Sequence, residues 1–373
     1  MICIKTVTLF EIRLPLKEPF LISSGAVTDR RILLLKLEDH DGQVAWSECV
    51  AGELPNYMPE TIDTCWLAIK NWIVPRVLNV AIQHPADVQA LLDTNFRGHN
   101  MAKAAVEMGC WALAAQKLDQ SLANYIGGTR RVIESGISLG IQRDTATLVE
   151  KVKDAFTQGY RKAKIKIKPG MDIEFLRAVR EACGPDAPLM ADANSAYTLE
   201  DVPHLKKFDA LNLMMIEQPL AWDDVVAHAQ LQKELTTPVC LDESITHLDR
   251  VREMVSLKSG RIVNIKPGRV GGFGASITMH DYCRDHGIPV WCGGMLESGV
   301  GRAYNVALAS LENFSIPGDI SPSRRYWEED IVSPEWDMDT KGNVEVPGHR
   351  TGIGVDVRED LIENLTVRRE KLE

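Results

Sequence analysis

The sequence of 373 residues lacks the features that mark membrane and secreted proteins. It has no run of about 18 apolar residues, the length that suggests a membrane-spanning helix, and its N-terminus has no basic segment followed by an apolar one. The eight cysteines form no CxxC pair and mostly lie within apolar segments, so we expect them to be reduced residues of the core. These absences predict a cytoplasmic protein without a membrane partner.

The charge and histidine patterns argue against several other classes of protein. The formal net charge is −10 and the basic residues are dispersed, whereas a nucleic-acid-binding protein gathers them on one face. The nine histidines include no HExxH sequence and no His-x-His on an early strand, which argues against a zinc hydrolase. The serine of the GxSxG match at 136–140, Ser138, falls within a predicted strand and so does not stand in a strand-to-helix elbow. A small molecule is therefore the expected partner.

The first part of the chain, residues 1–128, has the pattern of a small α+β domain. Alternating apolar residues predict antiparallel strands, and longer amphipathic stretches predict helices after them. Asn100 is the expected N-cap of the last of these helices. Strands followed by helices indicate a domain separate from what comes next. The predicted strands are 4–14, 31–38 and 43–48, and the predicted helices are 59–74, 85–95 and 101–118.

From residue 135 onward, short apolar runs alternate with amphipathic stretches, which is typical of parallel strands joined by helices. Eight such strands predict a closed α/β barrel of the (β/α)8 type over residues 129–324, and a barrel uses roughly 250 residues. The tail, 325–373, is assigned to the first domain, with 344–357 returning onto it as extended chain. The predicted strands are 137–141, 163–168, 188–193, 213–217, 238–242, 261–266, 289–293 and 314–318, and the predicted helices are 145–158, 173–182, 199–207, 223–234 and 248–257.

Four charged residues recur at nearly one spacing along this second part. Glu217 follows Asp192 by 25 residues, Asp242 follows Glu217 by 25, and Lys266 follows Asp242 by 24. Each ends a predicted strand, so all four should meet at one mouth of the barrel. Three converging carboxylates repel one another unless a cation is present, and oxygen ligands without histidine or cysteine favour Mg²⁺. The alternative is that each carboxylate caps the helix after its strand.

Lysines alternate with apolar residues along one predicted strand. Lys164, Lys166 and Lys168 share one face at a period of two, which we expect to point into the barrel. Burial and nearby cations lower the pKa of a lysine and make it a usable base. The alternative is a strand edge whose lysines extend to solvent. Lys266, on the sixth strand, should face Lys166 across the barrel, and the glycine run 268–274 only loosely resembles a phosphate loop.

Together these residues resemble a known family. The pattern Lys164-x-Lys166, Asp192, Glu217, Asp242 and Lys266 is similar to the enolase superfamily in its muconate-lactonizing-enzyme subgroup. The segments 98–113, 190–199, 264–272 and 293–303 resemble o-succinylbenzoate synthases that also racemise N-succinylamino acids. The resemblance implies a (β/α)7β variant of the barrel with an α+β capping domain, and a Mg²⁺-dependent enzyme that removes a proton next to a carboxylate.

The resemblance also implies roles for individual residues. Lys166 would be the base, Lys266 the opposed lysine, and Asp192, Glu217 and Asp242 the ligands of Mg²⁺, for which Mn²⁺ or another divalent ion could substitute. Lys164, Asn194 and Arg269 would support these groups. The residues expected to line the substrate are Ser138, Gly294 and Met295 of the barrel and Ser24 and Tyr57 of the capping loops.

Several alternatives stay open at this point. The expected activity is syn dehydration to o-succinylbenzoate in menaquinone synthesis, with racemisation beside it, but a dedicated racemase or a non-catalytic barrel would share the fold. Mandelate-racemase-like enzymes carry a His–Asp pair on strands seven and six, and dipeptide epimerases an Asp-x-Asp where this chain reads Asp319-Ile320-Ser321. Relatives are commonly dimers or octamers, so a homo-oligomer is expected.

Overall fold

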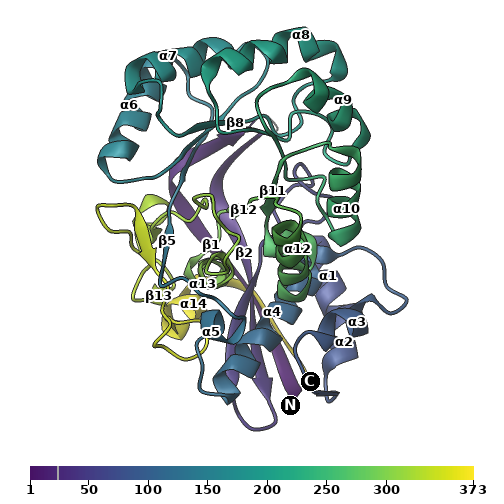
Figure 1. The fold of residues 1–373 in the computed structure, drawn as a ribbon. Coiled ribbons are helices and arrows are strands. Elements are labelled where there is room, and N and C mark those ends of the chain that lie inside the picture. The colour runs from purple at the N-terminus through teal and green to yellow at the C-terminus, as the bar shows by residue number, and fades with distance from the viewer. Residues whose placement is uncertain (23–24) are drawn as a thin grey trace.

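The computed structural model describes residues 1–22 and 25–373. An antiparallel sheet lies at one end of the molecule and a ring of parallel strands wrapped by helices at the other (Figure 1). None of the helices in the described part of the chain combines the length and apolar character needed to traverse a bilayer. The predicted class, an α/β barrel with an α+β capping domain, is confirmed.

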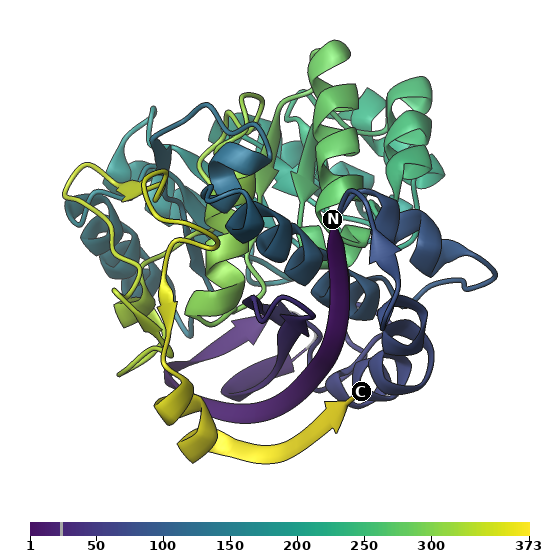
Figure 2. The ribbon, with the colours of Figure 1, turned by 90° about the horizontal axis from the view of Figure 1, so that it is seen from below.

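The antiparallel sheet has the order β16-β1-β2-β3. Leu9 of β1 pairs with Leu35 of β2, which in turn pairs with Ser47 of β3, so the predicted meander is confirmed. The strand from the C-terminal end of the chain, β16, runs beside β1 (Figure 2). The strands are β1 (Ile2–Ile22), β2 (Gly25–Asp39), β3 (Val44–Cys49) and β16 (Thr366–Leu372), and β4 (Ala81–Ile82) pairs with the start of β1.

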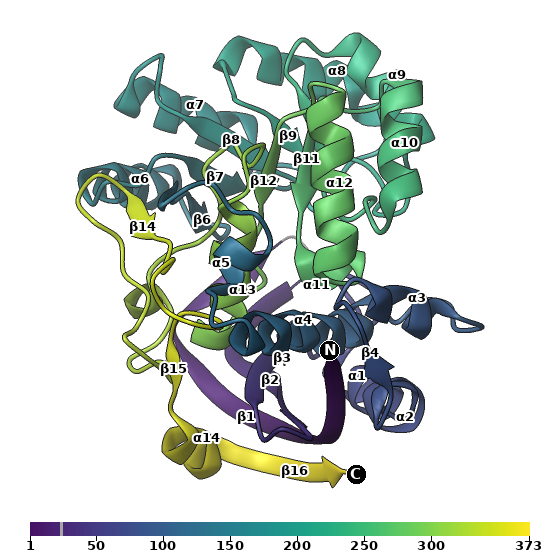
Figure 3. The same ribbon diagram turned by 60° about the horizontal axis from the view of Figure 1, so that its bottom comes forward.

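α4 packs between this sheet and the ring, while α1, α2 and α3 lie at one side of the sheet (Figure 3). The predicted cap of α4 is wrong. His99 is the N-cap residue, in the left-handed conformation, and Asn100 begins the helix with its side-chain amide bonded to the carbonyl oxygens of Thr246 and Arg269. The elements are α1 (Ile62–Ala68), the π-helical η1 (Ile69–Ile73), α2 (Val74–Val77), α3 (Asp87–Asp93), α4 (Asn100–Lys117) and α5 (Leu122–Tyr125).

The parallel sheet has seven strands in the order of the sequence, as alternating strand and helix patterns predict. Parallel pairing in chain order places the carboxyl ends of all strands at one mouth of the ring. The strands are β6 (Ile137–Leu139), β7 (Ala163–Lys166), β8 (Leu189–Asp192), β9 (Ile216–Glu217), β10 (Val239–Leu241), β11 (Ile262–Ile265) and β12 (Val290–Cys292).

The eighth predicted strand, 314–318, is wrong as a regular strand. This segment makes only isolated parallel bridges, Phe314 with Val290 of β12 and Gly318 with Ser135 just before β6. Pro317 lacks the N–H group that a continuous ladder needs. The segment still joins the two edges of the sheet, so the ring closes through single bridges.

Helices cover the outside of the ring in chain order (Figure 1). The predicted helix 199–207 is a chain of short turns around Pro203, while the other predicted helices are confirmed within a few residues. The elements are α6 (Thr145–Thr157), α7 (Ile173–Cys183), η2 (Leu199–Asp201), α8 (Val202–Leu205), η3 (Lys206–Leu211), α9 (Val226–Glu234), α10 (Leu248–Leu257), α11 (Pro267–Val270), α12 (Phe273–Asp285) and α13 (Gly299–Ala309).

The C-terminal tail follows its predicted path in part. The segment 344–357 is expected to return onto the first domain, and Gly352 does form a parallel bridge with Ser121. The two ends of the segment instead pair with β5 and β13, and β16 adds a second return beside β1. The division at residues 128 and 324 stays a prediction. The remaining elements are β14 (Asn343–Glu345) on β5 (Val132–Glu134), β15 (Asp356–Val357) on β13 (Val332–Ser333), η4 (Ser323–Arg325) and α14 (Glu359–Leu365).

A buried carboxylate of α4 reaches the ring at the start of α12. Glu107 accepts hydrogen bonds from the backbone N–H groups of Phe273 and Gly274, both at 2.8 Å, and from the indole of Trp111 at 2.6 Å. A Cβ atom on Gly272 would lie 2.2 Å from Glu107 Oε2. The glycine run at 268–274 therefore allows this close approach of the two domains.

Glu107 should make the stability of the protein depend on pH. Burial raises the pKa of its carboxyl from 4.5 to about 7. The folded protein then holds a proton that the unfolded chain releases, so the free energy of unfolding falls as the pH rises from 4.5 to about 7, by at most about 1.4 kcal/mol per pH unit. Glu107→Gln should remove this part of the slope in urea denaturation at about pH 5, 6 and 7.

Glu150→Gln, on the exposed side of α6, is the matched control and should keep the slope of the unaltered protein. An unchanged slope in Glu107→Gln would contradict the assignment.

Candidate functional site

The charged residues predicted from the sequence meet at the carboxyl ends of the parallel strands. Lys166 of β7 is paired in register with Asp192 of β8, and Asp192 with Glu217 of β9. Asp242 directly follows β10, and Lys266 directly follows β11. The three carboxylates are at most 1% exposed and Lys266 is 5% exposed. These charges therefore interact with little screening by water.

One half of the site is organised by two lysines of β7. Lys166 Nζ donates to Asp192 Oδ2 at 2.6 Å and to Asn194 Oδ1 at 2.7 Å. Lys164 precedes Lys166 by two residues on the same face of β7. Its Nζ lies 3.1 Å from a carboxylate oxygen of Asp192 and 3.2 Å from one of Glu217. Both lysines thus contact Asp192, and Lys164 also contacts Glu217.

The other half is organised by Asp242. Lys266 Nζ lies 2.8 Å from Asp242 Oδ2, and the guanidinium of Arg269 binds the other carboxylate oxygen. The hydroxyl of Tyr57, from the capping domain, lies 3.0 Å from both Lys266 Nζ and Arg269 Nη1 and 3.2 Å from both oxygens of Asp242. The capping domain therefore contributes directly to the placement of Lys266.

A cavity of about 390 Å³ opens between the two halves. Lys166 and Lys266 both line it, from strands on different sides of the ring. Gly294, Met295 and Tyr57 line it as well, together with both apolar and charged residues of β2 and of the loop after β3. The two amines therefore face one space.

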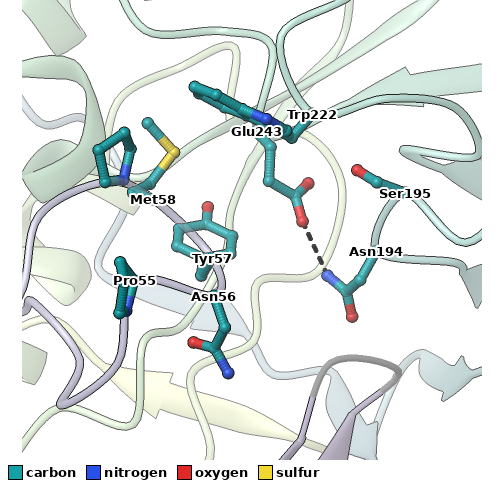
Figure 4. Close-up of a pocket in the computed structure, with 9 residues that line it drawn as sticks. Pro55, Asn56, Tyr57, Met58, Asn194, Ser195, Trp222 and Glu243 are labelled. Carbon is teal, nitrogen blue, oxygen red and sulfur yellow. Dashed lines mark hydrogen bonds between the residues drawn. The ribbon is translucent and has the colours of Figure 1, made fainter.

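A second cavity of about 410 Å³ is lined by residues of the loop 55–59 and by Asn194, Ser195, Trp222 and Glu243 (Figure 4). It shares Tyr57, Asn194 and neighbouring loop residues with the first cavity. Glu243 accepts a hydrogen bond of 2.9 Å from the Asn194 amide. The loop 55–59 thus contributes to both cavities.

One residue predicted to contact the substrate is placed differently. Ser138 is buried and paired in register with Lys164, and it does not line either cavity. Ser24 lies outside the described residues. Arg269 is fully buried and binds Asp242 and the hydroxyl of Tyr57, and its supporting role stays a prediction.

The carboxylates are held by ammonium and guanidinium groups. In residues 1–22 and 25–373, no three carboxylate, histidine or cysteine side chains surround one point closely enough to hold a metal ion. The donor chemistry nevertheless fits a hard divalent cation, because Asp192, Glu217 and Asp242 supply buried oxygen atoms only. Oε2 of Glu217 accepts no hydrogen bond of suitable geometry from any described residue, and its nearest cation is Lys164 at 3.2 Å. A divalent cation that binds these carboxylates would displace the ammonium groups that now contact them.

Burial and charge set the two cavity lysines apart. Burial lowers the pKa of Lys166 below its usual value, although Asp192 opposes this. Burial would also lower the pKa of Lys266, but Tyr57 and nearby carboxylates raise it above the usual value. Burial and the neighbouring Asp192 raise the pKa of Glu217, which indicates that the two carboxylates compete for the available positive charge.

The prediction that Lys164, Lys166 and Lys168 all point into the barrel is wrong for Lys168. Lys168 is exposed because β7 ends at Lys166, before the Pro169-Gly170 turn. The third inward lysine is Lys162, which is fully buried. Lys162 stands two residues before Lys164, so the same alternation of lysines and apolar residues could have identified it.

Two further residues at the strand ends were missed. Asn264 of β11 donates to Glu217 at 2.7 Å and accepts from the N–H of Gly293 at 2.8 Å. Asp319 follows the predicted last strand, and its carboxylate lies 2.6 Å from Lys164. An asparagine inside an apolar strand and an aspartate after one were the available signals.

Comparison with known proteins agrees with this geometry. Residues 4–127 match the family model described as the mandelate racemase/muconate lactonizing enzyme N-terminal domain, and residues 147–361 match the enolase C-terminal domain-like model. The chain is 46% identical to the o-succinylbenzoate synthase of Geobacillus kaustophilus over 97% of this chain and 96% of that protein. It is 45% identical to the N-succinylamino acid racemase of Thermus thermophilus, over 95% of each.

A crystal structure of an enolase superfamily member from Listeria innocua has a TM-score of 0.96 and 40% identity, covering 100% of this chain and 99% of the other. Both domains are therefore shared with the Listeria innocua protein in the same arrangement.

Gly293, between β12 and the cavity, should tolerate no side chain. A Cβ atom there would lie 2.5 Å from both the Asn264 amide and Lys266 Cε. Gly293→Ala should therefore lower the free energy of unfolding by about 1–3 kcal/mol and displace Lys266. Chemical denaturation measures the first effect.

Gly348→Ala is the matched control, since its added Cβ would meet nothing closer than 3.5 Å. Equal stabilities of the two variants would show that the space around Lys266 is not tightly packed.

Proposed function

Since the chain belongs to the mandelate racemase/muconate lactonizing enzyme family of the enolase superfamily, we propose that it is a Mg²⁺-dependent o-succinylbenzoate synthase that also racemises N-succinylamino acids. The observation that carries the proposal is that Lys166 and Lys266 line one cavity beside three buried carboxylates. Relatives similar over nearly the whole chain bear the names of both activities.

The dehydration would begin with Lys166. Its free amine takes the proton from the carbon next to the carboxylate of 2-succinyl-6-hydroxy-2,4-cyclohexadiene-1-carboxylate. The ammonium so formed returns the proton to the hydroxyl group, which leaves as water from the same face. Lys266 stays protonated and stabilises the negative charge, and Tyr57 and Arg269 hold it in place. General acid–base work by such a residue contributes about 10²- to 10⁴-fold to the rate.

Racemisation would use the same groups in another order. One lysine removes the proton from the α-carbon on its side, and the other lysine delivers a proton to the opposite face. The placement of the two amines on different strands around one cavity supports this division of labour. One site then serves both reactions.

The substrate carboxylate would bind near Lys164 and the three acids. A divalent cation, Mg²⁺ or Mn²⁺, held by Asp192, Glu217 and Asp242 would stabilise negative charge on that carboxylate. Asn194, Gly294, Met295 and Tyr57 would contact the rest of the substrate, with Ser138 beneath and Ser24 in the capping loop. A homo-oligomer is the assembly we propose.

Removal of divalent ions tests the metal requirement. Dialysis against a chelator should abolish both reactions, and Mg²⁺ should restore them, because the carboxylates need a cation to bind the substrate anion. Dehydration is followed by absorbance and racemisation by polarimetry. Full activity after chelation would contradict the proposal, and a fully folded protein that turns over neither substrate with Mg²⁺ would indicate a non-catalytic barrel.

Substitution of each lysine tests the two-base arrangement. Lys166→Ala should abolish both reactions. Lys266→Ala should eliminate racemisation, with a fall in its rate of about 10²- to 10⁴-fold, and should leave metal binding intact. Deuterium incorporation at the α-carbon of N-succinylamino acids in D₂O, measured by NMR beside a dehydration assay, reports both chemistries.

Lys168→Ala, an exposed lysine of the same segment, is the control and should retain both activities. Unchanged racemisation in Lys266→Ala would eliminate the two-base model. Racemisation without dehydration in the unaltered protein would identify a dedicated racemase instead.

A further inference from the structure

Two buried charged residues below the cavity take no part in the reaction described above. Lys162 is fully buried, and its Nζ lies 3.6 Å from the centre of the Trp291 ring and 3.3 Å from Asp319 Oδ1. Asp319 is 5% exposed. Neither Lys162 Nζ nor Asp319 Oδ1 has a hydrogen-bond partner of suitable geometry among the described residues. Such an incompletely satisfied pair is costly to bury and calls for a reason.

The other oxygen of Asp319 reaches Lys164. The distance from Asp319 Oδ2 to Lys164 Nζ is 2.6 Å, whereas Asp192 and Glu217 lie 3.1 and 3.2 Å from the same nitrogen. Asp319 is thus the nearest of three carboxylates that share one ammonium group. The other two are the ones assigned to the cation, so every interaction that draws Lys164 toward Asp319 weakens its hold on them.

The backbone fixes Asp319 at this level of the ring. Its N–H donates to the carbonyl oxygen of Cys292 at 2.9 Å, and the N–H of the preceding Gly318 donates to Glu134 at 3.1 Å. A Cβ atom on Gly294 would come within 2.8 Å of the Asp319 carbonyl oxygen, so this segment also packs closely against the cavity wall. The aspartate is held at the closure of the ring, below the strand ends that carry Asp192 and Glu217.

We propose that Asp319 is a positioning residue that anchors the Lys164 ammonium and so leaves Asp192 and Glu217 available to a divalent cation. This inference rests on the proposed function, because it takes these carboxylates as cation ligands. Without Asp319, the carboxylates in contact with Lys164 are the two cation ligands alone, so the ammonium group competes with the cation for them. Lys162 then supplies a positive charge beneath Asp319 that keeps the aspartate ionised.

Titration of the chelator-treated protein with MgCl₂ in a calorimeter tests this. Asp319→Asn keeps the shape of the side chain and removes its charge, and it should weaken Mg²⁺ binding by about tenfold or more. Circular dichroism checks that the fold is retained. Equal affinities in the unaltered protein and the variant would overturn the inference and leave the proposed function standing, whereas no Mg²⁺ binding by the unaltered protein would overturn both.

Two double variants separate anchoring from a change in net charge. Asp319→Asn with Lys164→Met removes the competing ammonium and should bring the Mg²⁺ affinity back to within about threefold of the unaltered protein. Asp319→Asn with Lys162→Met has the same net charge but keeps Lys164, and its affinity should stay low. Recovery in both double variants would mean that only net charge matters, and recovery in neither would mean general structural damage, so either result overturns the inference.

The second double variant also covers a failure of Asp319→Asn to fold. It removes both members of the buried pair, and such replacements by apolar residues are often well tolerated. Weak Mg²⁺ binding in that protein supports the anchor, and unaltered binding overturns it.

Discussion

Attraction between buried ammonium groups and buried carboxylates is the interaction on which the site depends. Asp192, Glu217 and Asp242 are almost completely removed from solvent, and like charges so close together in a poorly polarisable interior repel strongly. Lys164 and Lys166 on one side, with Lys266 and Arg269 on the other, offset that repulsion. The same arrangement leaves two amines facing one cavity, so the charge balance that permits burial also supplies the reactive groups.

The capping domain is part of this balance. Tyr57 reaches Lys266, Arg269 and Asp242 from a loop above the ring, and Glu107 holds the start of α12 a few residues after Arg269. Glu48 of β3 accepts hydrogen bonds from Ser298 and Gly301 at the start of α13, close to the cavity residues Gly294 and Met295. Both carboxylates bind free N–H groups at helix N-termini, where negative charge is favoured. The two domains therefore form one site.

Much of the fold could be predicted because its signals are local. A run such as Ala163–Lys166 alternates at a period of two, and helices such as Leu248–Leu257 repeat at a period near four, so the order of strands and helices was readable. Errors arose where the outcome depended on distant partners. Asn100 was expected to cap its own helix, but its amide binds two carbonyl oxygens of the ring. The segment 314–318 meets both edges of the sheet, as a closed barrel requires, but only through single bridges.

The residues at the ends of successive strands could be derived from the order of amino acids, because a repeated strand and helix unit of nearly constant length brings those ends to one mouth. Asp192, Glu217, Asp242 and Lys266 follow from that spacing alone. The contacts among these charges are visible only in the folded protein, since contacts across the ring depend on its closure and on side-chain length. Lys162 replaced Lys168 on the inward face, and Asp319 and Asn264 joined the charged groups, because packing of the ring interior selects these partners.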